Sequence, residues 1–251
     1  MASMDALLDA TYQAEQHHFW FRGFRKFVRP LVAEATSRIS NPRILDCGCG
    51  TGANMVMLGA FGSTFGFDVT WRGLQHAREY GQSRIAQADA THIPFGTGQF
   101  DLVTSFDVLY CLEEKAEQQA LAEIFRVLRP GGALIVNVAA LGILHGSHSI
   151  FGGEVRRSTR PRLRQILQRA GFTIGRLTYT NAVLFPLMLA VRSTQRLMGL
   201  ASREALGREI DVPPAPINAI LSTALSLEAE ALRFMNMPIG SSLLCLAWKP
   251  E

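Results

Sequence analysis

The stretch RILDCGCGTG, residues 43–52, decides the fold of this chain. Arg43 to Cys47 is typical of a short buried strand, and glycines follow at positions 48, 50 and 52. Glycine weakens regular structure, but it lets the backbone turn sharply and approach a ligand closely. The helix expected from Thr51 to Ala60 presents free N–H groups at its start. The stretch therefore predicts a strand, a ligand-binding turn and a helix.

Six further strands follow in a regular order along the chain. Helices of about ten to fifteen residues separate them, and this alternation indicates βαβ units and a parallel sheet with right-handed crossovers. We therefore expect an α/β fold with a Rossmann-like, doubly wound, mostly parallel seven-stranded sheet. The further strands are expected at Ser63–Val69, Arg84–Ala88, Phe100–Phe106, Ala133–Ala139, Thr173–Thr180 and Ser241–Pro250.

The chain is expected to divide into three parts. Residues 13–35 have apolar positions at helical spacing with a break at Pro30, so residues 1–40 are expected to form an N-terminal helical lid. Helices at Ala182–Leu200 and Ile217–Met235 separate the last two strands. We expect residues 41–181 and 241–251 to form the cofactor-binding core, and residues 182–240 to form a helical cap for the substrate.

Composition narrows the class of protein. Of the 251 residues, 48% are hydrophobic and 18% are charged, which is typical of a globular chain. The start lacks a signal-peptide pattern, and the longest apolar run, Ala182–Val191, is too short to span a bilayer. Cys47 and Cys49 have no second pair at zinc spacing, so no metal site is expected. We expect a cytoplasmic monomer or homodimer without stable membrane insertion.

Basic residues gather in one segment. The net charge of +4 is a mild excess, and we expect no nucleic acid as a partner. Six arginines lie close together without interleaved aromatic residues of the kind that stack on RNA bases. The cluster is either a solvated helix face with its lead-in or a docking site for an acidic substrate or a phosphate. Its members are Arg156, Arg157, Arg160, Arg162, Arg164 and Arg169.

Carboxylates stand at the ends of three strands. Asp46 precedes the glycines, Asp68 ends the second strand, and Asp89 follows the third. In such sheets ligands bind outside the carboxyl ends of the strands. A carboxylate such as Asp68 can accept hydrogen bonds from both ribose hydroxyls, and the Asp89-Ala90 pair can meet an adenine amino group. Asp46 suits a cationic ligand better than a pyrophosphate.

These segments resemble the successive motifs of class I S-adenosylmethionine-dependent methyltransferases of the small-molecule type. The motifs match in order and spacing across about residues 40–140 as ILDCGCGTG, FGFDVT, QADATHIPF, FDLVTSFDVLYCL and RVLRPGGALIVNV. Residues 17–28 (HHFWFRGFRKFV) are similar to an N-terminal segment of many such enzymes, and residues 156–172 are similar to their late helix. Residues 182–240 match nothing recognised in the family.

The resemblance implies S-adenosyl-L-methionine as the cofactor. Asp46 and the glycine turn would line its methionine part, and the start of the lid would fold over it with Arg22 near its carboxylate. The implied cofactor-binding residues are Trp20 and Arg22 in the lid, Asp46, Gly48, Cys49, Gly50, Phe106 and Asp107 around the methionine part, Asp68 at the ribose, and Val69, Asp89 and Ala90 at the adenine.

A general base is needed only where the methyl acceptor carries a proton with a high pKa. His145 and His148 follow the fifth strand and are the candidate catalytic bases, because a neutral imidazole can take a proton from a hydroxyl or an amine. A flexible loop with solvent-exposed histidines would explain both equally well. Tyr110, His145 and Phe185 are candidate substrate-binding residues, although Tyr110 also suits a packing role.

Methionine and aromatic residues in the cap either form its core or line an apolar pocket. We therefore expect a methyltransferase that moves a methyl group to an O or N of a small, apolar or aromatic acceptor by in-line displacement. Three alternatives stay open: a lipid-directed methyltransferase with residues 184–200 at a membrane surface, an RNA or protein methyltransferase, and a non-catalytic S-adenosylmethionine-binding module.

Overall fold

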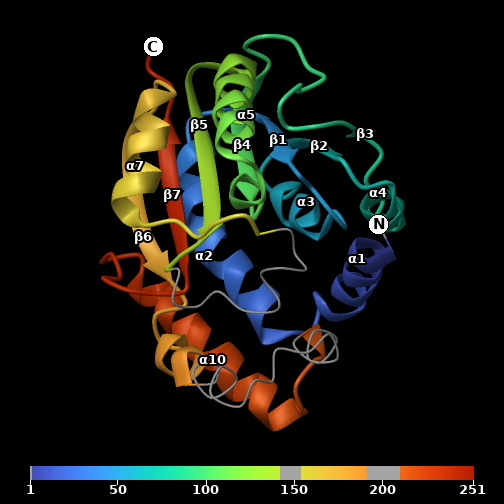
Figure 1. The fold of residues 1–251 in the computed structure, drawn as a ribbon, viewed down its shortest axis with the longest axis vertical. Coiled ribbons are helices and arrows are strands. Elements are labelled where there is room, and N and C mark those ends of the chain that lie inside the picture. The colour runs from blue at the N-terminus through green and yellow to red at the C-terminus, as the bar shows by residue number, and fades with distance from the viewer. Residues whose placement is uncertain (1, 142–153, 191–209) are drawn as a thin grey trace.

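One sheet organises the molecule. The computed structural model describes residues 2–141, 154–190 and 210–251 (Figure 1), and within them seven strands form a sheet in the order β3-β2-β1-β4-β5-β7-β6. The expected α/β, Rossmann-like, seven-stranded fold is confirmed. The strands are β1 (Arg43–Cys47), β2 (Ser63–Asp68), β3 (Ile85–Gln87), β4 (Phe100–Phe106), β5 (Leu128–Ala139), β6 (Thr173–Thr180) and β7 (Ser242–Trp248).

Most strand pairs are parallel. β1 pairs in parallel with β2 and β4, β2 with β3, and β4 with β5, whereas β7 runs antiparallel between β5 and β6. The register puts Cys47 opposite both Phe67 and Ser105. The carboxyl ends of β1 to β4 therefore share one edge, and the segments that leave these strands are brought together there.

Alternation along the strands gives the sheet two buried faces, as expected for a parallel sheet covered by helices. Leu45 and Val103 face a cluster that includes buried side chains of α5 and α7, whereas Ile44 and Leu102 face a cluster that includes α2, α3 and α10. The helices are α1 (Ala2–Ala14), α2 (Phe19–Thr36), α3 (Ala53–Leu58), α4 (Trp71–Glu79), α5 (Glu114–Val127), α7 (Arg160–Arg169) and α10 (Ala215–Ala231), with a 3-10 turn at Leu109–Cys111.

The single helix expected over residues 13–35 is wrong. Two helices, α1 and α2, replace it, because His18 takes an extended conformation and its Nδ1 caps α2 by accepting from the Trp20 N–H at 3.1 Å. Pro30 does not break α2, which continues to Thr36. α1 lies beside α4 (Figure 1), where the Asp9 carboxylate accepts from Arg72 at 2.6 Å.

The segment between β6 and β7 is helical where it is described. Residues 185–190 and α10 form helices. Of the expected Ala182–Leu200 helix, residues 182–184 form a turn and residues 191–200 lie outside the described residues. α10 packs along α2, and a Cβ at Gly23 would lie 2.4 Å from Leu225 Cδ1, so glycine permits this close approach. Among the described helices, none is both long and apolar enough to cross a membrane.

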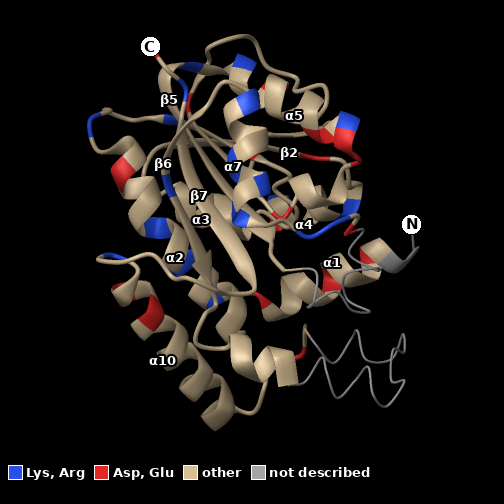
Figure 2. Ribbon diagram, turned by 60° about the vertical axis from the view of Figure 1, so that its left-hand side comes forward, with Lys and Arg blue, Asp and Glu red and all other residues tan. Residues whose placement is uncertain are grey.

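The arginine segment pairs largely within the chain. Arg156 and Arg162 both bind the buried Glu117 carboxylate on α5, and Arg157 Nε donates to Glu154 at 2.6 Å. Arg160 donates to the Met237 carbonyl at 2.8 Å. Arg160 and Arg162 belong to α7, whose basic positions are blue in Figure 2, and Arg156 and Arg157 precede it. The interpretation as a solvated helix face with its lead-in is wrong for these four arginines, because their half-buried side chains have partners within the fold.

Candidate functional site

The glycine turn adopts the backbone that its sequence predicts. Gly48, Gly50 and Gly52 all have positive φ angles, of 76°, 50° and 82°. A Cβ at Gly48 would meet Val108 Cγ2 at 2.3 Å, and one at Gly52 would meet Ala77 Cβ at 2.7 Å. A Cβ at Gly50 would meet nothing within 4 Å. Gly48 and Gly52 are thus required by packing, whereas Gly50 borders open space.

Asp68 ties the end of β2 to this turn. Its Oδ2 accepts from the Gly50 N–H at 2.8 Å, and its Oδ1 accepts from the N–H and the hydroxyl of Thr70 at 2.8 and 2.5 Å. Gly73 supports the same corner from α4, because a Cβ there would lie 2.9 Å from the Gly50 carbonyl oxygen. The carboxylate is therefore held by short bonds at the mouth of the turn, and its orientation is set before any ligand binds.

Asp46 lies deeper than the other carboxylates. It is buried at the end of β1, and its Oδ1 accepts from the Thr104 hydroxyl at 2.6 Å. Burial, helped by the nearby Asp68 carboxylate, raises the pKa of Asp46 to about 7. A cation bound at this end of β1 would stabilise the charged form of Asp46.

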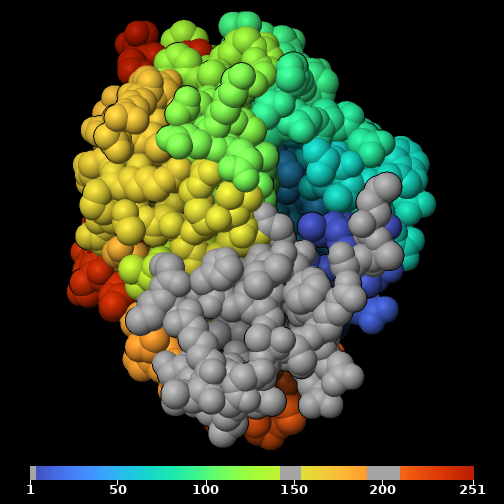
Figure 3. Space-filling model, in the orientation of Figure 1, coloured from blue at the N-terminus to red at the C-terminus, as the bar shows by residue number. Residues whose placement is uncertain are grey.

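Asp89 follows β3 at the outer end of the same edge. Its Oδ1 accepts from the N–H and the hydroxyl of Thr91, both at 2.7 Å, and the Thr91 N–H lowers the pKa of this exposed carboxyl. Ala90 is buried, whereas Val69 after β2 is 58% exposed. Figure 3 shows a hollow in the surface, bordered by teal residues of α3 and α4 and by green residues nearer α5.

The end of β4 supplies another polar group. Asp107 has a left-handed backbone, with a φ of 62°, and its Oδ1 accepts from Asn137 Nδ2 at 2.8 Å. Although Asp107 is exposed at the surface, neighbouring protein atoms partly desolvate it and raise its pKa to about 6. Burial raises the pKa of the nearby Tyr110 phenol as well. Asn137 Oδ1 is buried without a protein partner in the described part of the chain.

Helix α2 reaches this edge through an aromatic contact. Phe24 of α2 packs edge-on against Phe106 with ring centres 5.0 Å apart. In the first turn of α2, Trp20 is half-buried and Arg22 is exposed. α2 thereby places an aromatic side chain against the end of β4.

Glu15 is a buried carboxylate that the sequence did not reveal. It lies between α1 and α2, and its Oε2 accepts from the Thr51 hydroxyl in the glycine turn at 2.8 Å. Burial raises its pKa. Nothing in the pattern around residue 15 marks it as buried, whereas the asparagine in the apolar strand ALIVNVA was a usable signal for Asn137.

Two of the candidate residues, Cys49 and Phe185, are buried in the core. The Cys49 side chain is buried among Met55, Leu74 and Ile85, so it packs between α3 and α4. Phe185 is buried just after β6, at the opposite end of the sheet from β3. His145 and His148 lie outside the described residues.

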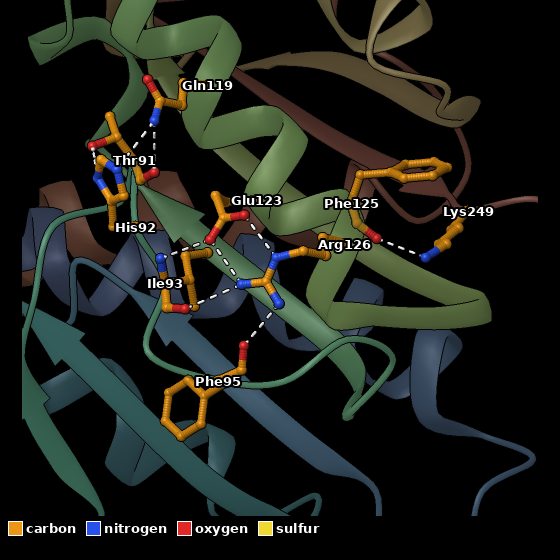
Figure 4. A network of polar contacts seen from close by, with 9 residues as sticks. All are labelled: Thr91, His92, Ile93, Phe95, Gln119, Glu123, Phe125, Arg126 and Lys249. Atoms are coloured by element: carbon orange, nitrogen blue, oxygen red, sulfur yellow. Dashed lines mark hydrogen bonds and ion pairs between the residues drawn. The ribbon is translucent and has the colours of Figure 1, made fainter.

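A polar network holds the segment that follows Asp89 (Figure 4). Arg126 of α5 donates to the carbonyls of Ile93 and Phe95 at 3.1 and 2.9 Å, while Glu123 accepts from the Ile93 N–H at 2.9 Å. Arg126 and Glu123 also bind one another at 2.7 Å. Gln119 donates to the Thr91 carbonyl at 3.1 Å. α5 thus fixes the backbone next to Asp89.

Comparison with known proteins identifies the family. The family model described as a methyltransferase domain matches residues 45–136. The chain is 32% identical over 149 residues to an uncharacterized methyltransferase of Synechocystis sp., covering 53% of this chain and 68% of that protein. The chain belongs to the class I S-adenosylmethionine-dependent methyltransferases. The resemblance seen in the sequence motifs is thereby confirmed.

Other relatives are similar to this methyltransferase over shorter stretches of sequence. A demethylmenaquinone methyltransferase of Lactiplantibacillus plantarum is 38% identical over 107 residues, covering 38% of this chain and 44% of that enzyme. The chain therefore spans less than half of that relative, and tRNA methyltransferases also occur among the matches. Among solved structures, the [4+2]-cyclase SpnF is 25% identical with a TM-score of 0.57, covering 90% of this chain and 80% of SpnF.

We expect Arg126→Leu to weaken cofactor binding through the segment beside Asp89. The change removes two charge-assisted bonds to backbone carbonyls and the ion pair with Glu123, which costs about 2–3 kcal/mol of stability. Binding of S-adenosylhomocysteine, measured by calorimetry, is expected to weaken about tenfold. Arg169→Leu, at an exposed position on α7, serves as the control. Equal affinities of the two folded variants would contradict a positioning role for Arg126.

Proposed function

We propose that this methyltransferase binds S-adenosyl-L-methionine at the glycine turn and transfers its methyl group to an O or N of a small, apolar or aromatic acceptor. The observation that carries the proposal is the hydrogen bond between the Gly50 N–H and the Asp68 carboxylate. A left-handed glycine with open space at its Cβ position is bonded to a preoriented carboxylate at the mouth of the turn. Such a corner can admit an amino-acid tail on one side and a ribose on the other.

The chemistry of the donor set fits the cofactor. Asp46, Asp68, Asp89 and Asp107 follow or end four parallel strands, so the edge is acidic and favours a cationic ligand. Burial raises the pKa of Asp46, and a bound sulfonium or ammonium group would lower this pKa again by favouring the ionised carboxylate. In this proposal Asp68 holds the ribose, Val69 flanks the adenine, and Asp89 with Ala90 meets the adenine edge.

The surroundings of β4 favour an apolar acceptor. Phe24 and Phe106 form an aromatic contact there, and Tyr110 lies nearby with a strongly desolvated phenol. Four of the six arginines considered as a phosphate-docking site are engaged within the chain instead. Arg156 and Arg162, for example, share the buried Glu117 carboxylate. This internal pairing removes the main sequence argument for an acidic substrate or for RNA at that segment.

The bound cofactor supplies a methyl group on a positively charged sulfur, so the protein has mainly to position and desolvate the reactants. The aromatic wall formed by Phe24 and Phe106 excludes water from the end of β4. Asp107, with its pKa raised to about 6, can hold a proton from an acceptor amine near neutral pH. His145 and His148 remain the predicted bases for a hydroxyl acceptor.

We expect His145→Ala and His148→Ala to lower turnover without loss of cofactor binding. A general base contributes about a hundredfold or more to rate, so the base among the two should show a fall of that order in kcat. The affinity for S-adenosylhomocysteine should stay within about twofold, because neither residue is assigned to the cofactor. Unchanged kcat in both variants would contradict the prediction and leave Asp107 or simple positioning as the explanation.

A direct test of the proposed function can begin before the acceptor is identified. Thermal stabilisation by S-adenosylmethionine and S-adenosylhomocysteine, but not by NAD, is expected for the purified protein. Transfer of isotopically labelled methyl groups to a panel of phenols, carboxylic acids and amines then identifies the acceptor class. Labelling of RNA or protein in place of every small molecule would refute the proposed acceptor, and absence of stabilisation would refute the proposed cofactor site.

A further inference from the structure

α10 carries an apolar stripe on its exposed side. Ile220, Leu227 and Phe234 recur every seven residues, a spacing that places side chains on one line of a helix. They are 68%, 67% and 87% exposed, and Phe234 continues the line just beyond the end of α10. The opposite side of α10 packs on α2 through buried residues such as Leu225. Single exposed apolar residues are ordinary, but three large ones along one side of a helix indicate an interaction surface.

The stripe is broadened by neighbouring apolar residues. Glu228 accepts from the N–H groups of Ala182 and Val183 at 2.9 and 3.0 Å, which fixes the start of the segment after β6 against α10. Val183 and Leu187 in that segment are both more than half exposed, as is Ile217 on α10. In Figure 2, α10 is tan along most of its length. The exposed charges on this part of the chain include Glu230, between Leu227 and Phe234, which pairs with Arg233 at 3.1 Å.

A row of cations flanks the stripe. Lys26 on α2 donates to Ser226 of α10 at 2.5 Å, so the exposed side of α2 lies directly beside α10. Arg22 and Arg29 are exposed and lie on the same side of α2 as Lys26, four and three residues away. The hollow between α2 and α3 is lined by Arg25, Lys26 and Arg29, and none of the described residues that line it is acidic.

We propose that the stripe of α10 and the cation row of α2 form a docking surface for an anionic lipid bilayer. Isoleucine, leucine and phenylalanine side chains can enter the boundary between headgroups and acyl chains, while lysine and arginine bind lipid phosphates at its level. A second copy of the chain fits less well, because a symmetric contact through α10 would bring the two cation rows toward one another. RNA fits less well too, because no aromatic residue on the exposed side of α2 offers a stacking face.

The docking surface adjoins the lid. Asn218 near the start of α10 accepts from the Phe19 N–H at 2.8 Å and donates to the His17 carbonyl at 2.9 Å. The same lid helix contacts the end of β4 through Phe24. A docked protein would therefore hold its acceptor side close to the membrane surface. The docking proposal stands on these contacts alone and does not depend on the identity of the methyl acceptor.

Vesicle co-sedimentation of the full chain tests the proposal. Binding is expected to vesicles of phosphatidylcholine mixed with phosphatidylglycerol, and to be much weaker with phosphatidylcholine alone. Lys26→Gln with Arg29→Gln should weaken binding to the mixed vesicles about twentyfold, since each surface cation contributes about fivefold. Ile220→Gln with Leu227→Gln should weaken it more than tenfold. The control pair Arg164→Gln with Arg169→Gln, on exposed positions of α7, removes the same charge and should change nothing.

The melting temperature of each variant is compared with that of the parent protein. Only variants with an unchanged melting temperature are used to judge vesicle binding. Absence of binding to mixed vesicles would overturn the proposal. An equal loss in the α7 pair would also overturn it, because attraction would then follow net charge alone. A concentration-dependent dimer that Ile220→Gln with Leu227→Gln abolishes, without vesicle binding, would assign the stripe to a second copy. RNA binding that is lost in the Lys26 and Arg29 pair, without vesicle binding, would assign the cation row to nucleic acid.

Discussion

Asp68→Ala is expected to weaken the binding of S-adenosylhomocysteine at least a hundredfold. The carboxylate has two roles at the mouth of the turn: it tethers the Gly50 N–H at 2.8 Å, and in the proposed complex it accepts from the ribose hydroxyls. Each charge-assisted hydrogen bond contributes about 1.5 kcal/mol or more, so two bonds to the ribose amount to about a hundredfold in affinity. Isothermal titration calorimetry with the purified variant measures the effect directly.

Thr70→Val is the matched control for Asp68→Ala. It removes the Thr70 hydroxyl, which donates to Asp68 at 2.5 Å, but it leaves the carboxylate and the backbone N–H of residue 70 in place. Its affinity should therefore fall only a few-fold. If Asp68→Ala stays folded and binds within about threefold of the parent protein, the ribose role of Asp68 is wrong. If both variants weaken binding equally, then Asp68 and Thr70 affect cofactor binding through the conformation of α4, and not through a contact of the carboxylate with the ribose.

The ends of the strands could be predicted from the sequence because the patterns that mark them involve residues close together in the chain. Buried strands, helical spacing and glycines at alternate positions are set by neighbouring residues, and a parallel sheet then brings Asp46, Asp68 and the segment after β4 to one edge. β5 begins earlier than expected, at Leu128, because the turn that follows α5 still pairs: the Gly131 N–H donates to the Lys249 carbonyl at 3.0 Å. That pairing depends on a segment more than one hundred residues away in the chain.

Long-range contacts explain the features that the sequence did not reveal. No pattern around Glu117 predicts that two arginines from residues 156–162 bind it. The sequence therefore allowed two interpretations of the arginine segment. His18 ends the expected long helix because its ring caps α2, a role that is uncommon for histidine. Glu15 is buried only because α1 returns toward the glycine turn at Thr51. In each case the partner lies on another element, and no local spacing encodes it.

Gly50→Ala is expected to leave the fold intact and to weaken cofactor binding about a hundredfold. The φ of Gly50 is 50°, so an alanine there carries a left-handed strain of about 1–2 kcal/mol, but its methyl group meets nothing within 4 Å in the protein. The space that receives this methyl group is the space proposed for the methionine part of the cofactor. A displacement of about 1 Å at a reacting or binding group can cost a hundredfold.

Gly131→Ala separates that steric effect from backbone strain. Gly131 has a φ of 72° and also has nothing within 4 Å of its Cβ position, yet it lies near the start of β5, at the opposite edge of the sheet from the glycine turn. Both variants should lower the melting temperature by similar amounts, whereas only Gly50→Ala should lose affinity for S-adenosylhomocysteine. Gly52→Ala should instead be strongly destabilised, because its Cβ would lie 2.9 Å from the Ala77 Cα. If Gly50→Ala binds as tightly as Gly131→Ala, the open space at Gly50 does not receive the cofactor, and the proposed site has to be moved away from the turn.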